Sequence, residues 1–205
     1  MPQRRVRVRK EAWETQYRKV SREDRQHEAL AAQRMGKTPA ELLRWVVTFA
    51  QEDLTSKRPE ELVALGYDLR MLPHLVKEQV AGVTRIWQRT LGPMPEATLQ
   101  VIHHYIAEGL RTLMGGRPWK LPGPFLVYRS SPEGSAKTQF SSGWGAARQE
   151  DEAILAAVVR LVLEHGGKLR ACPVCRRIFV STRRQRYCDT RCSQRVRNQR
   201  RKEAE

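Results

Sequence analysis

The sequence is short of acidic residues and of cysteine, and it has no long apolar run. Only 22 Asp and Glu stand against 38 Lys and Arg, so the formal net charge is +16, which favours a polyanionic partner. No stretch approaches the roughly 20 apolar residues that span a bilayer, so we expect no membrane partner. The basic start of the chain continues into Glu11 and Glu14 instead of an apolar run, so we expect no signal peptide. We therefore expect a cytoplasmic protein with reduced thiols.

The four cysteines of the chain lie within 21 positions of one another: Cys172, Cys175, Cys188 and Cys192. Their pattern, Cys-x2-Cys, twelve residues and Cys-x3-Cys, is typical of a structural zinc site. The first pair can form a tight knuckle, and the second pair, four residues apart, shares one face of a helix. We predict one structural Zn²⁺ bound by these four thiolates.

Other interpretations of the cysteines remain open at this point. Two disulfides are possible, although such frameworks belong to small extracellular domains. Four unrelated buried cysteines or an iron–sulfur cluster would also satisfy the composition. His165 lies close enough in sequence to replace one of the thiolates.

Positive charge is concentrated at two places in the sequence. Residues 166–205 hold 13 Lys and Arg against 3 acidic residues, and residues 1–10 carry five basic residues and no acid. The segment between them, with 20 basic and 19 acidic residues, is close to neutral. A nearly neutral central segment therefore lies between a basic arm (residues 1–10) and a basic finger (residues 166–205). Charge that served only solubility would be spread evenly along the chain.

The hydrophobic pattern predicts a mainly α-helical fold with one small β-hairpin near residues 124–141. We divide the chain into a basic arm with a polar helix (1–37), a helical body (38–165) and a finger (166–205), and we expect the body to fold alone. Thr38-Pro39-Ala40-Glu41 is the clearest helix start, because it supplies an N-cap, a first-turn proline and a capping-box glutamate. The predicted body helices span residues 39–54, 59–65, 73–91, 95–114 and 151–165.

For the finger we predict a treble-clef-like module built around the metal. Residues 178–180 are expected to pair with the segment before Tyr187, and a helix from Asp189 to about Lys202 carries the last two cysteines. Phe179, Val180 and Tyr187 are expected to fill its small core. Such a core is too small to fold alone, so metal binding would supply much of its folding free energy.

The finger also carries the residues that we expect to contact nucleic acid. Arginine binds phosphate through paired N–H groups, and arginine, glutamine and asparagine can bond bidentately to base edges. No acidic residue lies between positions 190 and 202, so the charged side chains of this surface are all positive. The candidate contacts are Arg183, Arg184, Arg186, Arg191, Gln194, Arg195, Arg197, Asn198 and Arg201.

The finger resembles the CGNR-type zinc-finger proteins, a bacterial family of stress-induced transcription regulators. The matching features are Arg170 to Cys175, Ile178-Phe179-Val180, the basic run Arg183, Arg184 and Arg186, Tyr187-Cys188, and the Cys-x3-Cys pair. The family continues with Gly-Asn-Arg, whereas this chain has Ser193-Gln194-Arg195. The resemblance implies a zinc finger that binds DNA and a helical region that senses an effector.

We therefore expect a DNA-binding transcription regulator that is not an enzyme, with duplex DNA as the partner and a ligand or protein partner for the helical body. RNA binding is the alternative, because arginine-rich helices bind both polymers. A nuclease with a structural zinc finger is a third possibility. No His-rich or acidic cluster accompanies the finger, which argues against the nuclease.

Overall fold

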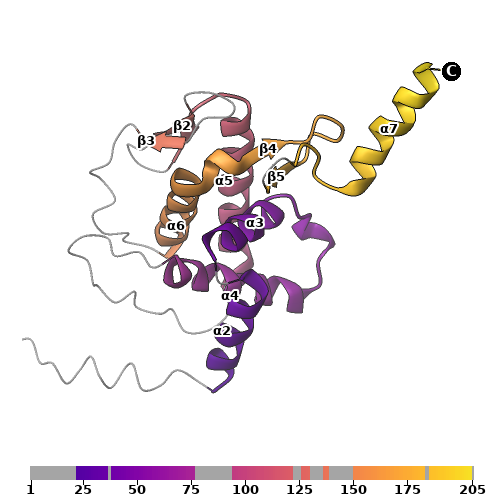
Figure 1. The fold of residues 1–205 in the computed structure, drawn as a ribbon. Coiled ribbons are helices and arrows are strands. Elements are labelled where there is room, and N and C mark those ends of the chain that lie inside the picture. The colour runs from indigo at the N-terminus through magenta and orange to yellow at the C-terminus, as the bar shows by residue number, and fades with distance from the viewer. Residues whose placement is uncertain are drawn as a thin grey trace, which may run out of the picture.

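The protein is described by a computed structural model that covers residues 22–36, 38–76, 94–121, 126–129, 136–138, 150–182 and 185–204. Its described part is mainly helical with short antiparallel strands, which confirms the predicted fold class (Figure 1). The helices are α2 (Arg22–Met35), α3 (Pro39–Phe49), α4 (Pro59–Leu75), α5 (Glu96–Met114), α6 (Glu150–His165) and α7 (Thr190–Ala204), with 3-10 turns η1 (Leu54–Ser56) and η2 (Gly166–Lys168). The strands are β1 (Trp119–Lys120), β2 (Leu126–Arg129), β3 (Ala136–Thr138), β4 (Leu169–Ala171) and β5 (Ile178–Val180).

Helices α3 to α6 enclose one apolar core, and α2 packs on α4. The core takes the apolar stripe of each helix, as the helical spacing predicts. Residues with almost no exposed surface include Leu43, Val46, Leu69, Ile106 and Val158. Within the described ranges, none of the helices combines the length and apolar character needed to cross a membrane.

Helix α3 begins with the predicted capping box. The Glu41 N–H donates to Thr38 Oγ1 at 3.3 Å, and the Thr38 N–H donates to Glu41 Oε2 at 2.9 Å. The helix ends at Phe49, earlier than the expected residue 54, because Asp53 instead caps the separate turn η1 by accepting from the Thr55 N–H at 3.1 Å.

Helix α4 does not end at Gly66, as the sequence suggested, but runs to Leu75. Gly66 is buried in mid-helix against Met94, and a Cβ there would lie 2.9 Å from the Met94 Cβ. The glycine therefore allows a close approach and does not stop the helix. Pro73, expected to start the next helix, lies in the last turn of α4, which therefore lacks the bond that residue 73 would donate to the carbonyl of residue 69. The predicted helix 73–91 otherwise lies outside the described residues from position 77.

The predicted hairpin is present as β2 and β3, which pair antiparallel through Tyr128 and Lys137. A third strand that the sequence did not indicate, β1, pairs with the other edge of β2. Its Trp119 is buried against Gly109 of α5, where a Cβ would lie only 2.0 Å from the indole ring. This mid-helix glycine therefore makes the room that β1 needs.

An ion pair with a buried carboxylate fastens α2 to α4. Asp68 of α4 is 2% exposed, and Arg34 of α2 donates from Nε to its carboxylate oxygens at 3.1 and 3.2 Å. Burial raises the pKa of Asp68, and the arginine opposes that rise. Removing one partner alone would leave the other charge without compensation, which is costly in a buried site.

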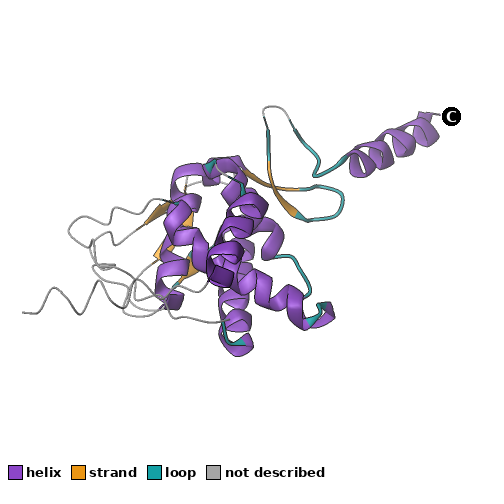
Figure 2. Ribbon diagram, turned by 90° about the horizontal axis from the view of Figure 1, so that it is seen from below, coloured by secondary structure: helices purple, strands orange, loops and turns teal. Residues whose placement is uncertain are grey.

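Strands β4 and β5 connect the body to the four-cysteine region, across the boundary that we placed at residue 166. They pair antiparallel from Leu169↔Val180 to Ala171↔Ile178. The side chains of Leu169, Ile178 and Val180 belong to the main core together with the helices. Helix α7, in contrast, projects away from the body in both views and shares no extensive packing with another element (Figures 1 and 2).

This arrangement predicts where the chain can be shortened. A chain that ends at Thr182 keeps β4 and β5, so its free energy of unfolding should match that of the full protein. A chain that ends at His165 loses three buried apolar side chains, each worth about 1.5–3 kcal/mol, so its free energy of unfolding should fall by about 5 kcal/mol or more. Urea unfolding followed by circular dichroism compares the two; equal stability would contradict the shared core.

Candidate metal centre and basic helix

The first cysteine pair lies in the connection between β4 and β5. Cys172 follows β4 directly, and its N–H donates to the Arg177 carbonyl while its own carbonyl accepts from the Arg176 N–H, both at 2.9 Å. These bonds close the expected knuckle. Arg176 has a φ of 62°, in the left-handed region, which costs a residue with a Cβ about 1–2 kcal/mol. The surrounding hydrogen bonds therefore hold the turn against local strain.

The second cysteine pair lies at the start of α7. Cys192 lies in its first turn, whereas Cys188 precedes the helix and does not lie on it as expected; their sulfurs are nevertheless 3.6 Å apart. Asp189 caps the helix, since its Oδ1 accepts from the Cys192 N–H at 2.7 Å, and this bond lowers the pKa of Asp189. An aspartate directly before a helix is a signal that sequence reasoning could have used.

The four sulfur atoms converge on one point. They all lie within 4.8 Å of one another, and the contacts Cys175–Cys188 and Cys188–Cys192 are 3.4 and 3.6 Å long. Four thiolates around an ion at the usual zinc–sulfur bond length of 2.3 Å would lie about 3.8 Å apart. No disulfide joins them. The cluster could therefore hold a metal ion, and in the described part of the chain it is the one such group of three or more ligand side chains.

The electrostatics of the cluster favour a cation. Burial would raise the pKa of the Cys172 thiol, but backbone N–H groups directed at its sulfur lower the pKa to about 6. These donors belong to Cys175, Cys188 and Val174. Burial, together with neighbouring thiols, raises the pKa of Cys188, and burial raises that of Cys192 to about 11. Without a cation the four groups would not all ionise near neutral pH, whereas a divalent ion would stabilise all four as thiolates.

Two details of the predicted finger are corrected by the structure. Residues 178–180 pair with β4, which precedes the knuckle, and the described residues 185 and 186 before Tyr187 form no strand. Val180 packs in the main core, while Phe179 packs beside the cysteines with Val174 and Tyr187. The second correction follows from strand geometry, because alternate residues of a strand point to opposite faces and β5 lies between two cores.

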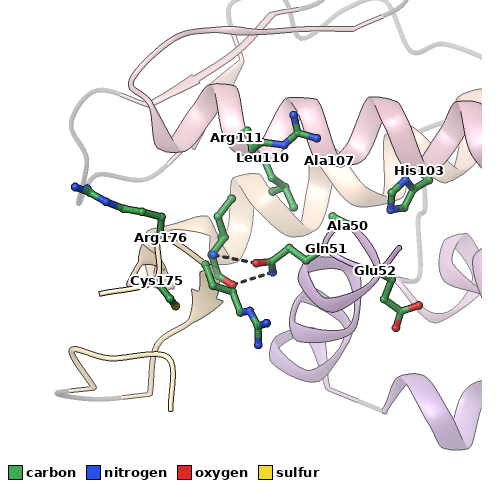
Figure 3. Close-up of a pocket in the computed structure, with 11 residues that line it drawn as sticks. Ala50, Gln51, Glu52, His103, Ala107, Leu110, Arg111, Cys175 and Arg176 are labelled. Atoms are coloured by element: carbon green, nitrogen blue, oxygen red, sulfur yellow. Dashed lines mark hydrogen bonds between the residues drawn. The ribbon is translucent and has the colours of Figure 1, made fainter. Parts of the chain in front are cut away.

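Gln51 fastens the knuckle to the body. Its side-chain amide pairs with the backbone of Ile178, accepting from the N–H at 3.1 Å and donating to the carbonyl at 2.9 Å (Figure 3). The same nitrogen donates to the Val47 carbonyl at 2.8 Å. Gln51 thus bonds to β5 much as a neighbouring strand would. No sequence signal marks this residue, since the contact joins positions 127 apart.

A pocket of about 480 Å³ lies where the knuckle meets the body (Figure 3). Its walls come from the end of α3, from α5 and from the knuckle, and include Gln51, His103, Leu110, Arg111, Cys175 and Ile178. His103 packs edge-on against Phe49 with 5.1 Å between ring centroids, and its Nε2 is buried without a hydrogen-bond partner. His165, considered as a substitute ligand, lies outside the sulfur cluster, with its Nε2 3.8 Å from a Glu164 oxygen.

Helix α7 presents its polar side chains to solvent around most of its circumference. Residues that recur at helical spacing line one shallow groove along its length: Arg191, Gln194, Arg195, Asn198, Gln199 and Lys202. Arg197 and Arg201 are also exposed, beside this groove at the spacing of the helix, and Arg186 is exposed before the helix begins. Arg183 and Arg184 lie outside the described residues. The candidate contacts that are described therefore gather on or next to one helix.

Comparison with models of protein families, with curated proteins and with solved structures finds no match. The resemblance to the CGNR-type zinc-finger proteins therefore stays a prediction from the residues of the finger.

The Gln51 contact gives a testable prediction. Gln51→Glu keeps the size of the side chain but replaces its N–H donor with an oxygen that faces the Ile178 carbonyl. Gln51 is itself exposed, so the loss of this hydrogen bond should lower the free energy of unfolding in urea by about 0.5–1.5 kcal/mol. The matched control is Gln33→Glu, because Gln33 is likewise exposed and lies on α2. Equal stability of the two variants would show that the amide pairing contributes nothing.

Proposed function

We propose that this protein is a zinc-dependent nucleic-acid-binding protein that contacts duplex DNA through α7 and regulates transcription. The observation that carries the proposal is the isolation of α7. The helix projects from the body, begins at the sulfur cluster, and exposes a face of arginine, asparagine and glutamine side chains. Such a surface has no partner within the described chain and suits a polyanion.

The dimensions of α7 support a groove of duplex DNA as the site of contact. Its 15 residues make a rod about 22 Å long and about 10–12 Å wide with its side chains. The major groove of B-form DNA is about 12 Å wide and admits one helix, whereas the major groove of A-form RNA is narrow and deep. Because no described element of the body packs extensively along α7, a duplex could surround it on three sides.

The side chains of the groove face fit a division of roles. Gln194, Arg195 and Asn198 are of the types that bond bidentately to base edges. Arg186, Arg197 and Arg201 lie beside this face or before the helix and would contact phosphates, together with Arg183 and Arg184. Phosphate contacts would set the position of the helix, and base contacts would select the sequence.

Zinc is the proposed ion because four thiolates in tetrahedral spacing are its usual structural site. The ion would fix the start of α7 against the knuckle, and nothing in this role needs redox or hydrolytic chemistry. The protein is accordingly proposed as a binding protein and not as an enzyme.

The metal assignment predicts one zinc per chain. Protein purified without added zinc should contain close to one equivalent by elemental analysis, and Cys188→Ser should lose it because three thiolates leave the tetrahedron incomplete. The circular dichroism of the helical body should persist after chelation, since the main core does not include the sulfur cluster. Full zinc content in Cys188→Ser, or iron in place of zinc, would contradict the assignment.

Binding should depend strongly on salt. With about five phosphate contacts, counterion release lowers the affinity for duplex DNA on the order of a few hundredfold between about 50 and 200 mM salt. Arg186→Ala should weaken binding to all sequences and reduce the log–log slope by about one unit. Fluorescence anisotropy with duplex DNA, single strands and structured RNA measures both quantities. Tighter binding to RNA than to any duplex selected from random DNA would favour the RNA-binding alternative.

Base recognition should reside on the groove face. Arg195→Ala and Asn198→Ala should each reduce discrimination between a selected site and random duplex by about 1–3 kcal/mol. Arg200→Ala is the control, because Arg200 is exposed on the same helix but does not line the groove. It should lower affinity for all sequences alike. Equal effects of the three substitutions on discrimination would show that this face does not read bases.

A further inference from the structure

The four sulfurs of the metal centre differ in their access to solvent. Cys172 has no exposed surface and Cys192 is 8% exposed, because both pack against Phe179. Cys188 is half-buried, whereas Cys175 is exposed at the tip of the knuckle. Cys175 is therefore the most solvent-accessible of the four residues.

Two further features distinguish Cys175. Its sulfur lies 3.4 Å from that of Cys188, so a second thiolate stands ready to react with any product formed on the first. The residue also borders the pocket between knuckle and body, whose floor includes the apolar Ala107, Leu110 and Ile178. The space beside Cys175 is thus wide enough for a molecule larger than water and partly apolar, while the Cys175 sulfur itself points toward the other cysteines (Figure 3).

We propose that Cys175 is an oxidation site that reacts with hydroperoxides, and that its oxidation releases the metal by joining Cys175 to Cys188. The Cys175 thiolate attacks the terminal peroxide oxygen, an S–O bond forms, the O–O bond breaks, and water or an alcohol leaves after protonation. The Cys188 thiolate then attacks the Cys175 sulfur, an S–S bond forms, and the S–O bond breaks to release hydroxide, which takes up a proton to become water. The two sulfurs lose two electrons and the peroxide gains them, and the metal leaves as a divalent ion with two ligands lost.

The consequence for α7 follows from its lack of other anchors. The new disulfide keeps the chain attached before the helix, but Cys192 no longer shares an ion with the knuckle. The helix then loses the contact that fixes its direction relative to the body. This step rests on the proposed function: the affinity of the oxidised protein for duplex DNA should fall about tenfold, comparable to the loss of one good contact.

The test uses the full-length, zinc-loaded protein and hydrogen peroxide or cumene hydroperoxide as the probe. Zinc release is followed with a chromogenic chelator, and alkylation with mass spectrometry maps the first disulfide. We expect release of one zinc per chain, together with a Cys175–Cys188 disulfide that dithiothreitol reverses. Faster reaction with cumene hydroperoxide would indicate that the pocket receives organic peroxides, and equal rates would indicate hydrogen peroxide as the oxidant. A first disulfide between Cys188 and Cys192, or zinc retained at ten equivalents of peroxide, would overturn the proposal.

Variants separate the role of Cys175 from simple loss of the site. Cys175→His keeps a zinc ligand and removes the exposed sulfur, so it should retain zinc and resist peroxide at least about tenfold longer. The matched variant Cys192→His keeps the reactive pair and should stay sensitive. If either variant fails to bind zinc, the identity of the first disulfide in the unaltered protein decides whether Cys175 is the oxidation site. Because zinc release is measured without nucleic acid, this result stands apart from whether the protein binds DNA.

Discussion

The convergence of four thiols is the interaction on which the placement of α7 depends. Cys172 and Cys175 lie on a hairpin that is part of the body, whereas Cys188 and Cys192 lie at the start of a helix with no extensive packing of its own. The apolar cluster around Phe179 is too small to hold the two parts together. An ion shared by both pairs would therefore act as the joint between body and helix.

Strand β5 makes this joint rigid on the body side. Its alternating side chains divide between two cores, Ile178 and Val180 toward the helices and Phe179 toward the cysteines. Gln51 holds the same strand by its backbone. The end of α3 and the knuckle are therefore connected directly through the three residues of β5, with no flexible linker between α3 and the knuckle. A displacement of the end of α3 would displace the knuckle as well.

The sequence predicted what depends on local pattern, and missed what depends on contacts between distant segments. The cysteine spacing located the sulfur cluster, and Thr38 with Glu41 located the start of α3, because both are short-range signals. Gly66 and Gly109 could not be interpreted from sequence, since each is required by a neighbour that other parts of the chain supply. The pairing of β5 with β4 is local, since the two strands flank the knuckle; it was missed because β5 was assigned to a partner that follows it in the sequence instead of the strand that precedes it. The isolation of α7 cannot be derived from its composition.

Charge along α7 explains how a helix without a packed face can be stable. Its first turn, where the helix dipole is positive, adjoins the Asp189 carboxylate, and its last turn carries Arg201 and Lys202 at the negative end. Repulsion between like charges four residues apart opposes these favourable interactions. The pairs are Arg191 with Arg195 and Arg197 with Arg201. A polyanion along the exposed face would remove that repulsion and leave the favourable terms in place. Helix α7 would thus be more stable against a phosphate backbone than in water, so its stability would depend on the proposed partner.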